Sequence, residues 1–242
     1  MNNEITLVYT YYNNPETLEF QTRTWQSYPE EIKKTLKVIV VDDCSPIPAL
    51  PILKDQHLNL SLFRVKTDIP WNITGAKNLG ANQAETKWIF VSDIDHFFTS
   101  TNITRLLQLP LDETRYYNIN RARVGDTELD SRNVKYFWPS NNLMLLTKQA
   151  FWKAGGFDED FAGSYGCEGG YFRRCLKAVN IRQTILGGVI LNYFCSSKFM
   201  LDSKTPNLSR DKVKNRALYI EKKMKRIPQS TDHLRFEWER QI

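Results

Sequence analysis

The segment Ser92-Asp93-Ile94-Asp95 carries the side chains of this chain that are best suited to chemistry. It follows the apolar run 88–91, which predicts a buried strand. In an extended backbone, residues two apart point to the same side, so both carboxylates would face one place. Hard divalent cations prefer such oxygen ligands, and open α/β sheets bind ligands at the carboxyl ends of their strands. The spacing therefore indicates a metal-bridged nucleoside diphosphate, with a simple aspartate turn as the alternative.

Strands and helices alternate through the first half of the chain, which predicts a parallel sheet with right-handed crossovers. Asn14-Pro15 has the form of a helix start, with Asn as the N-cap and Pro at the first helical position. The run 36–41 is apolar apart from Lys37, as in a strand that is covered on both faces. The expected strands are 5–10, 36–41, 61–65 and 87–92, and the expected helices are 14–28 and 74–84.

The second half reads less regularly. We expect strands at 115–123, 142–147 and 182–191, and helices at 101–108, 148–154, 168–178 and 209–225. Gly155-Gly156 would end the helix 148–154. The sequence has neither a repeat nor a low-complexity linker, which favours one domain over 1–242. Its parts would be a nucleotide-binding half (1–100), an acceptor half (101–200) and a basic helical tail (201–242).

Composition is that of a globular protein, with 41% hydrophobic and 25% charged residues. No apolar run approaches the roughly 20 residues that span a bilayer, and the N-terminus does not resemble a signal peptide. The four cysteines lack zinc-type spacing, so we expect a cytoplasmic protein. Residues 201–242 hold 11 Lys/Arg against 6 Asp/Glu, a net +5. We expect no nucleic-acid binding, because the aromatic-interleaved motifs of RNA modules are missing. Three roles are possible for this tail. It could contact an anionic membrane surface, bind a diphosphate, or simply form a charged helix in solvent.

Four motifs in the same order give the chain a family resemblance. They are Val40-Val41-Asp42-Asp43-Cys44-Ser45, Gly75-Ala76-Lys77-Asn78-Leu79-Gly80, Ser92-Asp93-Ile94-Asp95, and Gly155-Gly156-Phe157-Asp158-Glu159 followed by Tyr165-Gly166-Cys167-Glu168. They resemble the motifs of GT-A glycosyltransferases of the family-2 type, the last with a galactosyltransferase-type acceptor region. The resemblance implies an α/β GT-A fold, Rossmann-like, with a mostly parallel sheet flanked by helices.

The resemblance also implies which residues bind the donor. Thr10 and Tyr11 would border the nucleotide base, and either Asp43 or Asp42 would hydrogen-bond the base or ribose. Lys77 would supply positive charge near the nucleotide, although a solvated helix position is equally typical of a lysine. Asn78 would donate or accept a hydrogen bond there.

A divalent cation, Mn²⁺ or Mg²⁺, is the cofactor that the resemblance implies. Asp95 would bind it directly, and Asp93 would contact the ribose, the metal, or both. His96 directly follows and could face the site, although packing or exposure to solvent is the more common role for such a histidine. Arg210 and Lys212 would close over the diphosphate.

The acceptor side departs from the family pattern at Gly169, where inverting members usually place an aspartate as general base. Glu168 would be the base of an inverting enzyme, or would position the acceptor in a retaining one. Asp158 and Glu159 belong to the same acceptor motif. Trp138 and Asn141 are further acceptor-binding candidates, because aromatic faces stack on sugar rings and amides bond hydroxyls.

The function implied is metal-dependent transfer of a sugar from a nucleoside diphosphate donor to a hydroxyl of a glycan or glycoconjugate, and we expect the donor to be uridine-based. A nucleotidyltransferase is the rival enzyme, but no glycine-rich phosphate loop follows the first strand. A degenerate domain that binds nucleotide or glycan without turnover is the rival outside enzymes, and Gly169 is the residue that favours it.

Overall fold

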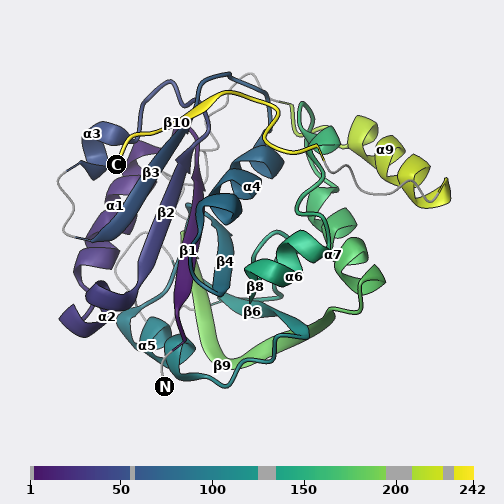
Figure 1. The fold of residues 1–242 in the computed structure, drawn as a ribbon. Coiled ribbons are helices and arrows are strands. Elements are labelled where there is room, and N and C mark those ends of the chain that lie inside the picture. The colour runs from purple at the N-terminus through teal and green to yellow at the C-terminus, as the bar shows by residue number, and fades with distance from the viewer. Residues whose placement is uncertain (1–2, 55–57, 125–134, 195–208, 226–231) are drawn as a thin grey trace.

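The computed structural model describes residues 3–54, 58–124, 135–194, 209–225 and 232–242. Its strands form one sheet with helices on both faces (Figure 1). The strands are β1 (Ile5–Tyr11), β2 (Lys37–Asp42), β3 (Asn59–Val65), β4 (Trp88–Asp93), β5 (His96–Phe97), β6 (Arg115–Val124), β7 (Lys135–Phe137), β8 (Met144–Thr147), β9 (Arg182–Phe194) and β10 (Trp238–Arg240). Their order is β10-β3-β2-β1-β4-β8-β6-β9-β5, with β7 paired to β6.

The sheet has two parts of different character. Strands β3, β2, β1 and β4 are parallel neighbours. Beyond them β8 runs antiparallel between β4 and β6, and β9 is parallel to β6. The α/β class is therefore confirmed, with the uninterrupted parallel arrangement confined to the first half of the chain.

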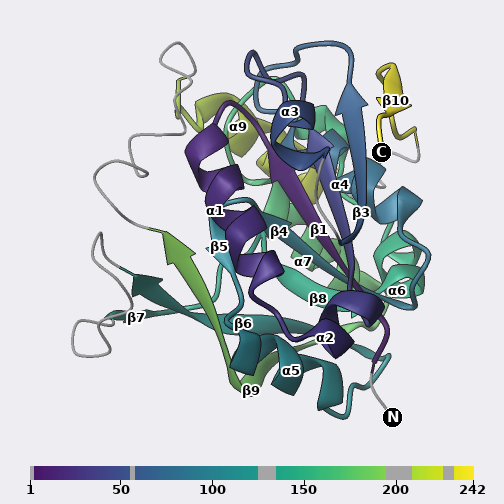
Figure 2. The same ribbon diagram turned by 90° about the vertical axis from the view of Figure 1, so that its left-hand side faces the viewer.

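Helices cover each face of the sheet over its own apolar cluster. One face carries α1 (Pro15–Gln26), α2 (Glu30–Thr35), α3 (Leu50–Leu53) and α5 (Ser100–Gln108). The other carries α4 (Ile73–Gln83), α6 (Lys148–Lys153) and α7 (Glu168–Ala178). Figure 2 shows α1, α2 and α5 in front of the sheet, with α4 and α6 beyond it. Strand β1 supplies both clusters, since Leu7 and Tyr9 face the first and Val8 the second.

Every helix and strand expected from the sequence is present, with ends that differ by at most four residues. Asn14 caps α1 by accepting from the Thr17 backbone N–H, as its position predicted. Gly155 and Gly156 end α6 with φ of 85° and 65°, a conformation that favours glycine. The elements that the sequence did not predict are short: α2, α3, β5, β7, β10 and the 3₁₀ turn Glu159–Phe161.

The prediction of a helical tail was wrong beyond its first part. Helix α9 spans Val213–Met224, but the chain then ends in β10, which pairs antiparallel with β3. The ring of Trp238 packs edge-on against Phe63, with 5.8 Å between centroids. The alternation of Phe236 and Trp238 with glutamates was the available strand signal. None of the described helices is long and apolar enough to cross a membrane.

Candidate functional site

The carboxyl ends of β1, β2 and β4 meet at one edge of the sheet and bring the predicted donor-side residues together. Thr10 lies in register with Asp93 on the neighbouring strand, and Tyr11 with Asp42. The backbone N–H of Asp43 donates to the Tyr11 carbonyl at 3.0 Å. This is the edge at which parallel α/β sheets bind ligands.

Asp93, Asp95 and His96 form a compact group at the end of β4. One ligand atom from each lies within 4.8 Å of the others. The two carboxylate side chains are 31% and 46% exposed, whereas the His96 side chain is buried. His96 Nδ1 lies 2.6 Å from Asp95 Oδ1, and its ring stacks on Tyr193. His96 is therefore packed and also faces the site.

The charge balance at Asp95 favours its ionised form. Partial burial of the carboxyl opposes ionisation, but the attraction and hydrogen bond of His96, with the positive charge of Lys77, lower its pKa below the usual range. An ionised carboxylate is the form that binds a metal ion.

Lys77 is a buried residue of α4, not a solvated one, with 1% of its side chain exposed. Its Nζ lies 2.8 Å from Asp93 Oδ1, in the geometry of an ion pair more than of an aligned hydrogen bond. The same nitrogen donates to the Asn142 carbonyl at 2.9 Å and lies 5.7 Å from the Phe157 ring centroid. A buried cation requires such partners, so Lys77 fixes the position of Asp93.

Glu168 is tied to this group through Asn142, a residue that the sequence did not single out. Asn142 Nδ2 donates to Glu168 Oε1 at 2.7 Å. Contacts therefore run without a break from Asp93 through Lys77 and Asn142 to Glu168, at the start of α7. The acidic motif and the acceptor motif belong to one cluster of side chains.

Gly169 occupies a position that has no room for a side chain as Asn142 is placed. A Cβ there would lie 1.8 Å from Asn142 Oδ1 and 3.0 Å from the Asn141 carbonyl oxygen. The space that the usual aspartate would enter is filled by Asn142, which holds Glu168 instead. Asn141 itself turns outward, and its side-chain oxygen accepts from Arg173.

The two aspartates that end β2 have different surroundings. Asp42 is fully buried and accepts from the Ser45 and Ala49 backbones and from Arg64 at 2.6 Å. Asp43 is 8% exposed and accepts from Asn72 Nδ2 at 2.8 Å. Burial raises the pKa of Asp43 to about 7. Asp42 thus organises its own loop, and Asp43 has the greater capacity for a ligand.

Two neighbouring tyrosines at the end of β1 also differ in their surroundings. Tyr11 lies in the core, where its hydroxyl donates to the Ile47 carbonyl and burial raises its pKa to about 12. Tyr12 is half-buried, and its hydroxyl lies 3.3 Å from Asp68. Strand parity places Tyr11 on the core face with Leu7 and Tyr9, a signal present in the sequence. Tyr12 is therefore the less buried of the two tyrosines at this edge of the sheet.

Three of the predicted site residues, Asn78, Asp158 and Glu159, make buried contacts that join separate segments of the chain. Asn78 is fully buried, exchanges hydrogen bonds with the backbone of Phe157 and donates to Glu159. Glu159 also accepts from the backbone of Leu234, and Asp158 pairs with Lys222 of α9 at 2.7 Å. The carboxylates of Asp158 and Glu159 are buried and bonded within the chain, which leaves them unsuited to an acceptor sugar.

The remaining predicted residues, Trp138, Arg210 and Lys212, are exposed at the surface. Trp138 is 81% exposed, and its carbonyl accepts from Arg121, whose guanidinium lies near His96. Lys212 and Arg210 lie over the Tyr165 ring, at 5.3 Å and 6.0 Å from its centroid.

The segment that carries these two cations is fixed by Trp71. The indole of Trp71 contacts the Tyr165 ring, with centroids 4.7 Å apart, and donates from Nε1 to the Ser209 carbonyl. Trp71 has a φ of 53°, a left-handed conformation that is uncommon for a bulky residue and often found at functional sites. Trp71 was not predicted from the sequence, and its partner Tyr165 was named only as part of the acceptor motif.

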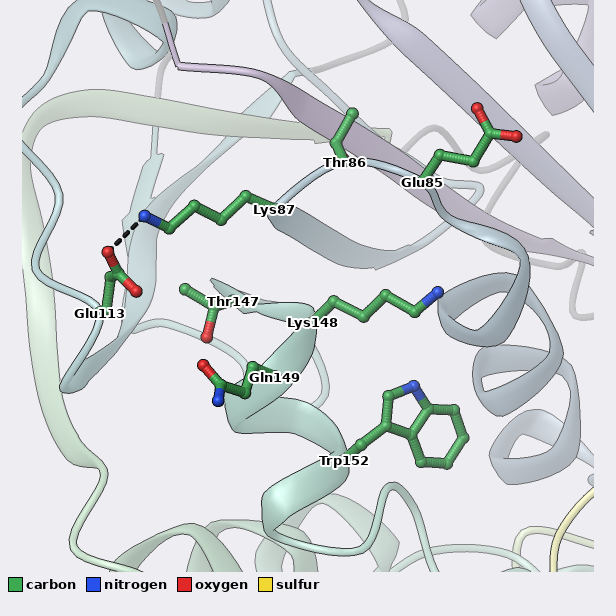
Figure 3. A pocket seen from close by; sticks show the side chains of 8 residues that line it. All are labelled: Glu85, Thr86, Lys87, Glu113, Thr147, Lys148, Gln149 and Trp152. Carbon is green, nitrogen blue, oxygen red and sulfur yellow. Dashed lines mark hydrogen bonds and ion pairs between the residues drawn. The ribbon is translucent and has the colours of Figure 1, made fainter.

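A separate pocket lies at the opposite end of β4 (Figure 3). It is lined by Glu85, Thr86, Lys87, Glu113, Thr147, Lys148, Gln149 and Trp152. Lys87 is paired with Glu113, and Lys148 donates to the Asn82 and Ala84 carbonyls at the end of α4. Both lysines of the pocket therefore have partners within the protein. The pocket lies away from the predicted donor site.

Residues 6–166 match the sequence model described as Glycosyl transferase family 2. That match ends before Cys167 and Glu168, so it covers only the first part of the galactosyltransferase-type motif, which stays a prediction. A comparison with curated proteins finds no significant relative.

Two solved structures are similar in fold. S. aureus TarS 1–349 in complex with UDP-GlcNAc has a TM-score of 0.61 and 15% identity over 80% of this chain and 58% of that one. GalNAc-T7 with UDP, GalNAc and Mn²⁺ has a TM-score of 0.62 and 12% identity, over 80% of this chain and 44% of that one. The chain thus spans less than two thirds of either structure, and the likeness concerns the fold.

Proposed function

The chain belongs to glycosyl transferase family 2 and is a glycosyltransferase with a GT-A fold, and from this premise we propose that it transfers a sugar from a UDP-linked donor to a hydroxyl of a glycan or glycoconjugate, with Mn²⁺ or Mg²⁺ as cofactor. The unbroken contacts from Asp93 through Lys77 and Asn142 to Glu168 carry the proposal. They join a candidate cation site to a buried carboxylate on the acceptor side.

The cation site would consist of Asp93 and Asp95, with His96 as ligand or as the partner that orients Asp95. The half-exposed carboxylates and the imidazole fit a divalent ion, and a nitrogen ligand suits Mn²⁺ better than Mg²⁺. A cation held there would offset the charge that develops on the leaving diphosphate. Lys77 would hold Asp93 in place through their 2.8 Å contact.

The donor nucleotide would lie along the carboxyl ends of β1 and β2. Asp43 is the proposed partner of the base or ribose, because Asp42 already accepts three hydrogen bonds. Thr10 and the outward-facing Tyr12 would border the base. A uridine donor is supported by the UDP-containing complexes of TarS and GalNAc-T7.

Arg210 and Lys212 would contact the diphosphate from the side of Tyr165. Both lie over Tyr165, two residues upstream of Cys167 and three upstream of Glu168. Cationic side chains fixed near a departing diphosphate stabilise the charge that forms during transfer.

Glu168 would act on the acceptor hydroxyl, as base or as positioning group, with Trp138 and Asn141 contacting the acceptor sugar. The Asn142 hydrogen bond fixes one oxygen of Glu168. Since the room beside Gly169 is filled, no second carboxylate is available at that position.

The test is release of UDP by the purified chain from UDP-GlcNAc, UDP-GalNAc, UDP-glucose and UDP-galactose. Each reaction is run with Mn²⁺, Mg²⁺ or chelator. We expect metal-dependent release from one donor and its loss in Asp95→Asn. Release that persists in chelator and in the variant would contradict the proposed cation site. Nucleotide binding without release, also after addition of glycan acceptors, would favour a domain that binds without turnover.

A further inference from the structure

Helix α9 presents an apolar stripe on its outer face. Val213, Ile220 and Met224 are 71%, 46% and 77% exposed, and Ala217 is exposed between them. Spacings of four, three and four residues place these side chains in one row along a helix. Large apolar side chains gathered on one face commonly mark an interaction site.

The inner face of α9 is held to the protein by polar contacts and by Tyr219, whose ring packs edge-on against Tyr171. Asn215 donates to the carbonyls of Phe161 and Ser164 at 2.9 Å and 2.7 Å. Lys222 pairs with Asp158 and Asp160 at 2.7 Å and 2.6 Å. These contacts anchor the helix with its apolar row turned outward. The row therefore makes no contribution to the folded core that would explain it.

Basic residues flank the row. Lys214, Arg216, Lys223 and Lys225 are all exposed, and Glu221 is the single acidic residue within Val213–Met224. A helix with an apolar row bordered by Lys and Arg binds in the plane of a membrane surface, where the apolar side chains enter the headgroup region and the cations meet anionic lipids.

We propose that the outer face of α9 docks on an anionic phospholipid surface. Charge decides between this partner and a second copy of the chain, because two such faces would bring their basic borders together and repel. Lys212, which directly precedes α9, packs against Tyr165 and lies close to Gly166. Docking would therefore hold the segment before Glu168 close to the lipid surface. The docking needs no substrate, so it stands apart from the proposed chemistry.

Flotation of the full chain with phosphatidylcholine vesicles, with and without phosphatidylglycerol, tests the proposal. Wild type should bind only the anionic vesicles, and added salt should weaken the binding. The triple variant V213S/I220S/M224S should lose at least about tenfold in vesicle affinity, because its apolar row no longer enters the bilayer. The charge variant Lys214→Glu with Lys223→Glu should lose binding as well.

A matched pair of isoleucines provides the control. Ile220 is 46% exposed on α9 and Ile185 is 45% exposed on β9. Ile220→Ser should weaken vesicle binding, and Ile185→Ser should leave it unchanged. Failure of wild type to bind anionic vesicles would overturn the proposal, as would equal effects of the two serine variants. A dimer that the triple variant dissociates, without vesicle binding, would assign the face to a second copy. UDP release measured in parallel reports on the proposed function separately.

Discussion

Two acidic turns of this chain have the same Asp-x-Asp spacing and opposite surroundings. At the end of β4, Asp93 and Asp95 keep side-chain exposures of 31% and 46%, and their side-chain partners are Lys77 and His96. Oxygen atoms with this exposure can still accept a ligand. The Asp-x-Asp spacing sets the direction of the two carboxylates. The number of hydrogen-bond donors and cations around them decides whether they can still bind a ligand.

The second turn, Asp158-Glu159-Asp160, uses its carboxylates internally. The Asp158 side chain is fully buried against Lys222, and Asp160 lies 2.6 Å from both Lys222 and Arg235. Two cations and several backbone N–H groups satisfy this turn, which joins α9 and the C-terminal segment to the domain. The same spacing therefore serves internal contacts here, while at β4 it leaves the carboxylates available to a ligand.

The largest expected effect comes from removing a carboxylate of the β4 turn. Asp95→Asn should lower UDP release at least about 100-fold, because charge stabilisation of the leaving diphosphate is lost. The free energy of unfolding should change by less than about 1 kcal/mol, since the side chain is half exposed. Kinetics beside chemical denaturation measure both. A loss of stability as large as the loss of activity would make the two turns equivalent and break the comparison.

The opposite pattern is expected for the second turn. Lys222→Met leaves Asp158 buried without its cation, which should cost roughly 3 kcal/mol of unfolding free energy. Lys225→Met is the control, because its pair with Glu221 is exposed and should contribute less than about 0.5 kcal/mol. Urea denaturation of both variants gives the values. Equal costs would mean that burial does not distinguish these pairs.

Neighbouring glycines extend the contrast between occupied and open space. Gly169→Ala should cost about 1–3 kcal/mol and lower activity, because its Cβ must displace Asn142 from Glu168. Gly170 lies in the same helix, and a Cβ added there meets nothing within 4 Å. Gly170→Ala should therefore raise the free energy of unfolding by about 0.5–1 kcal/mol. Thermal unfolding compares the two. A neutral Gly169→Ala would indicate that Asn142 moves aside freely and that a base could be restored there.

The sequence predicted the parts of the site that depend on neighbours along the chain. Asp93 ends the strand that positions both aspartates and Asp95 lies two residues beyond it, so apolar patterning was enough to find them. The same holds for Asn14 and Gly155, whose roles are local. For this reason the β4 turn was correctly placed at the carboxyl edge of the sheet.

Residues joined by long-range contacts were not predictable in the same way. Asn142 contacts Lys77 and Glu168 across 65 and 26 residues of chain, and neither separation carries a periodic signal. The sequence predicted Asn141 and not Asn142 for this reason, since only the folded chain shows which of the two amide side chains turns inward. Asn78 and Glu159 carry motif-like identities but meet each other in the core across 81 residues.

An effect that emerges only as pH rises is expected at the end of β2, where Asp42 and Asp43 repeat the contrast between an engaged and an available carboxylate. The pKa of Asp43 is about 7 in the folded protein, against an ordinary value of 3.8. Between these values the folded state binds the proton more tightly, so stability from this group is complete at low pH and declines as pH rises from about 4 to about 7. Asp43→Asn keeps an oxygen for Asn72 and should flatten this decline, which makes the variant more stable than wild type at pH 8 by about 1–3 kcal/mol. Affinity for UDP should fall in the same variant, because a stabilised site has lost the carboxylate that a ligand would use. Denaturation across pH and calorimetric UDP binding measure the two effects, and a variant that is less stable at every pH would place Asp43 with Asp42 among the structural carboxylates.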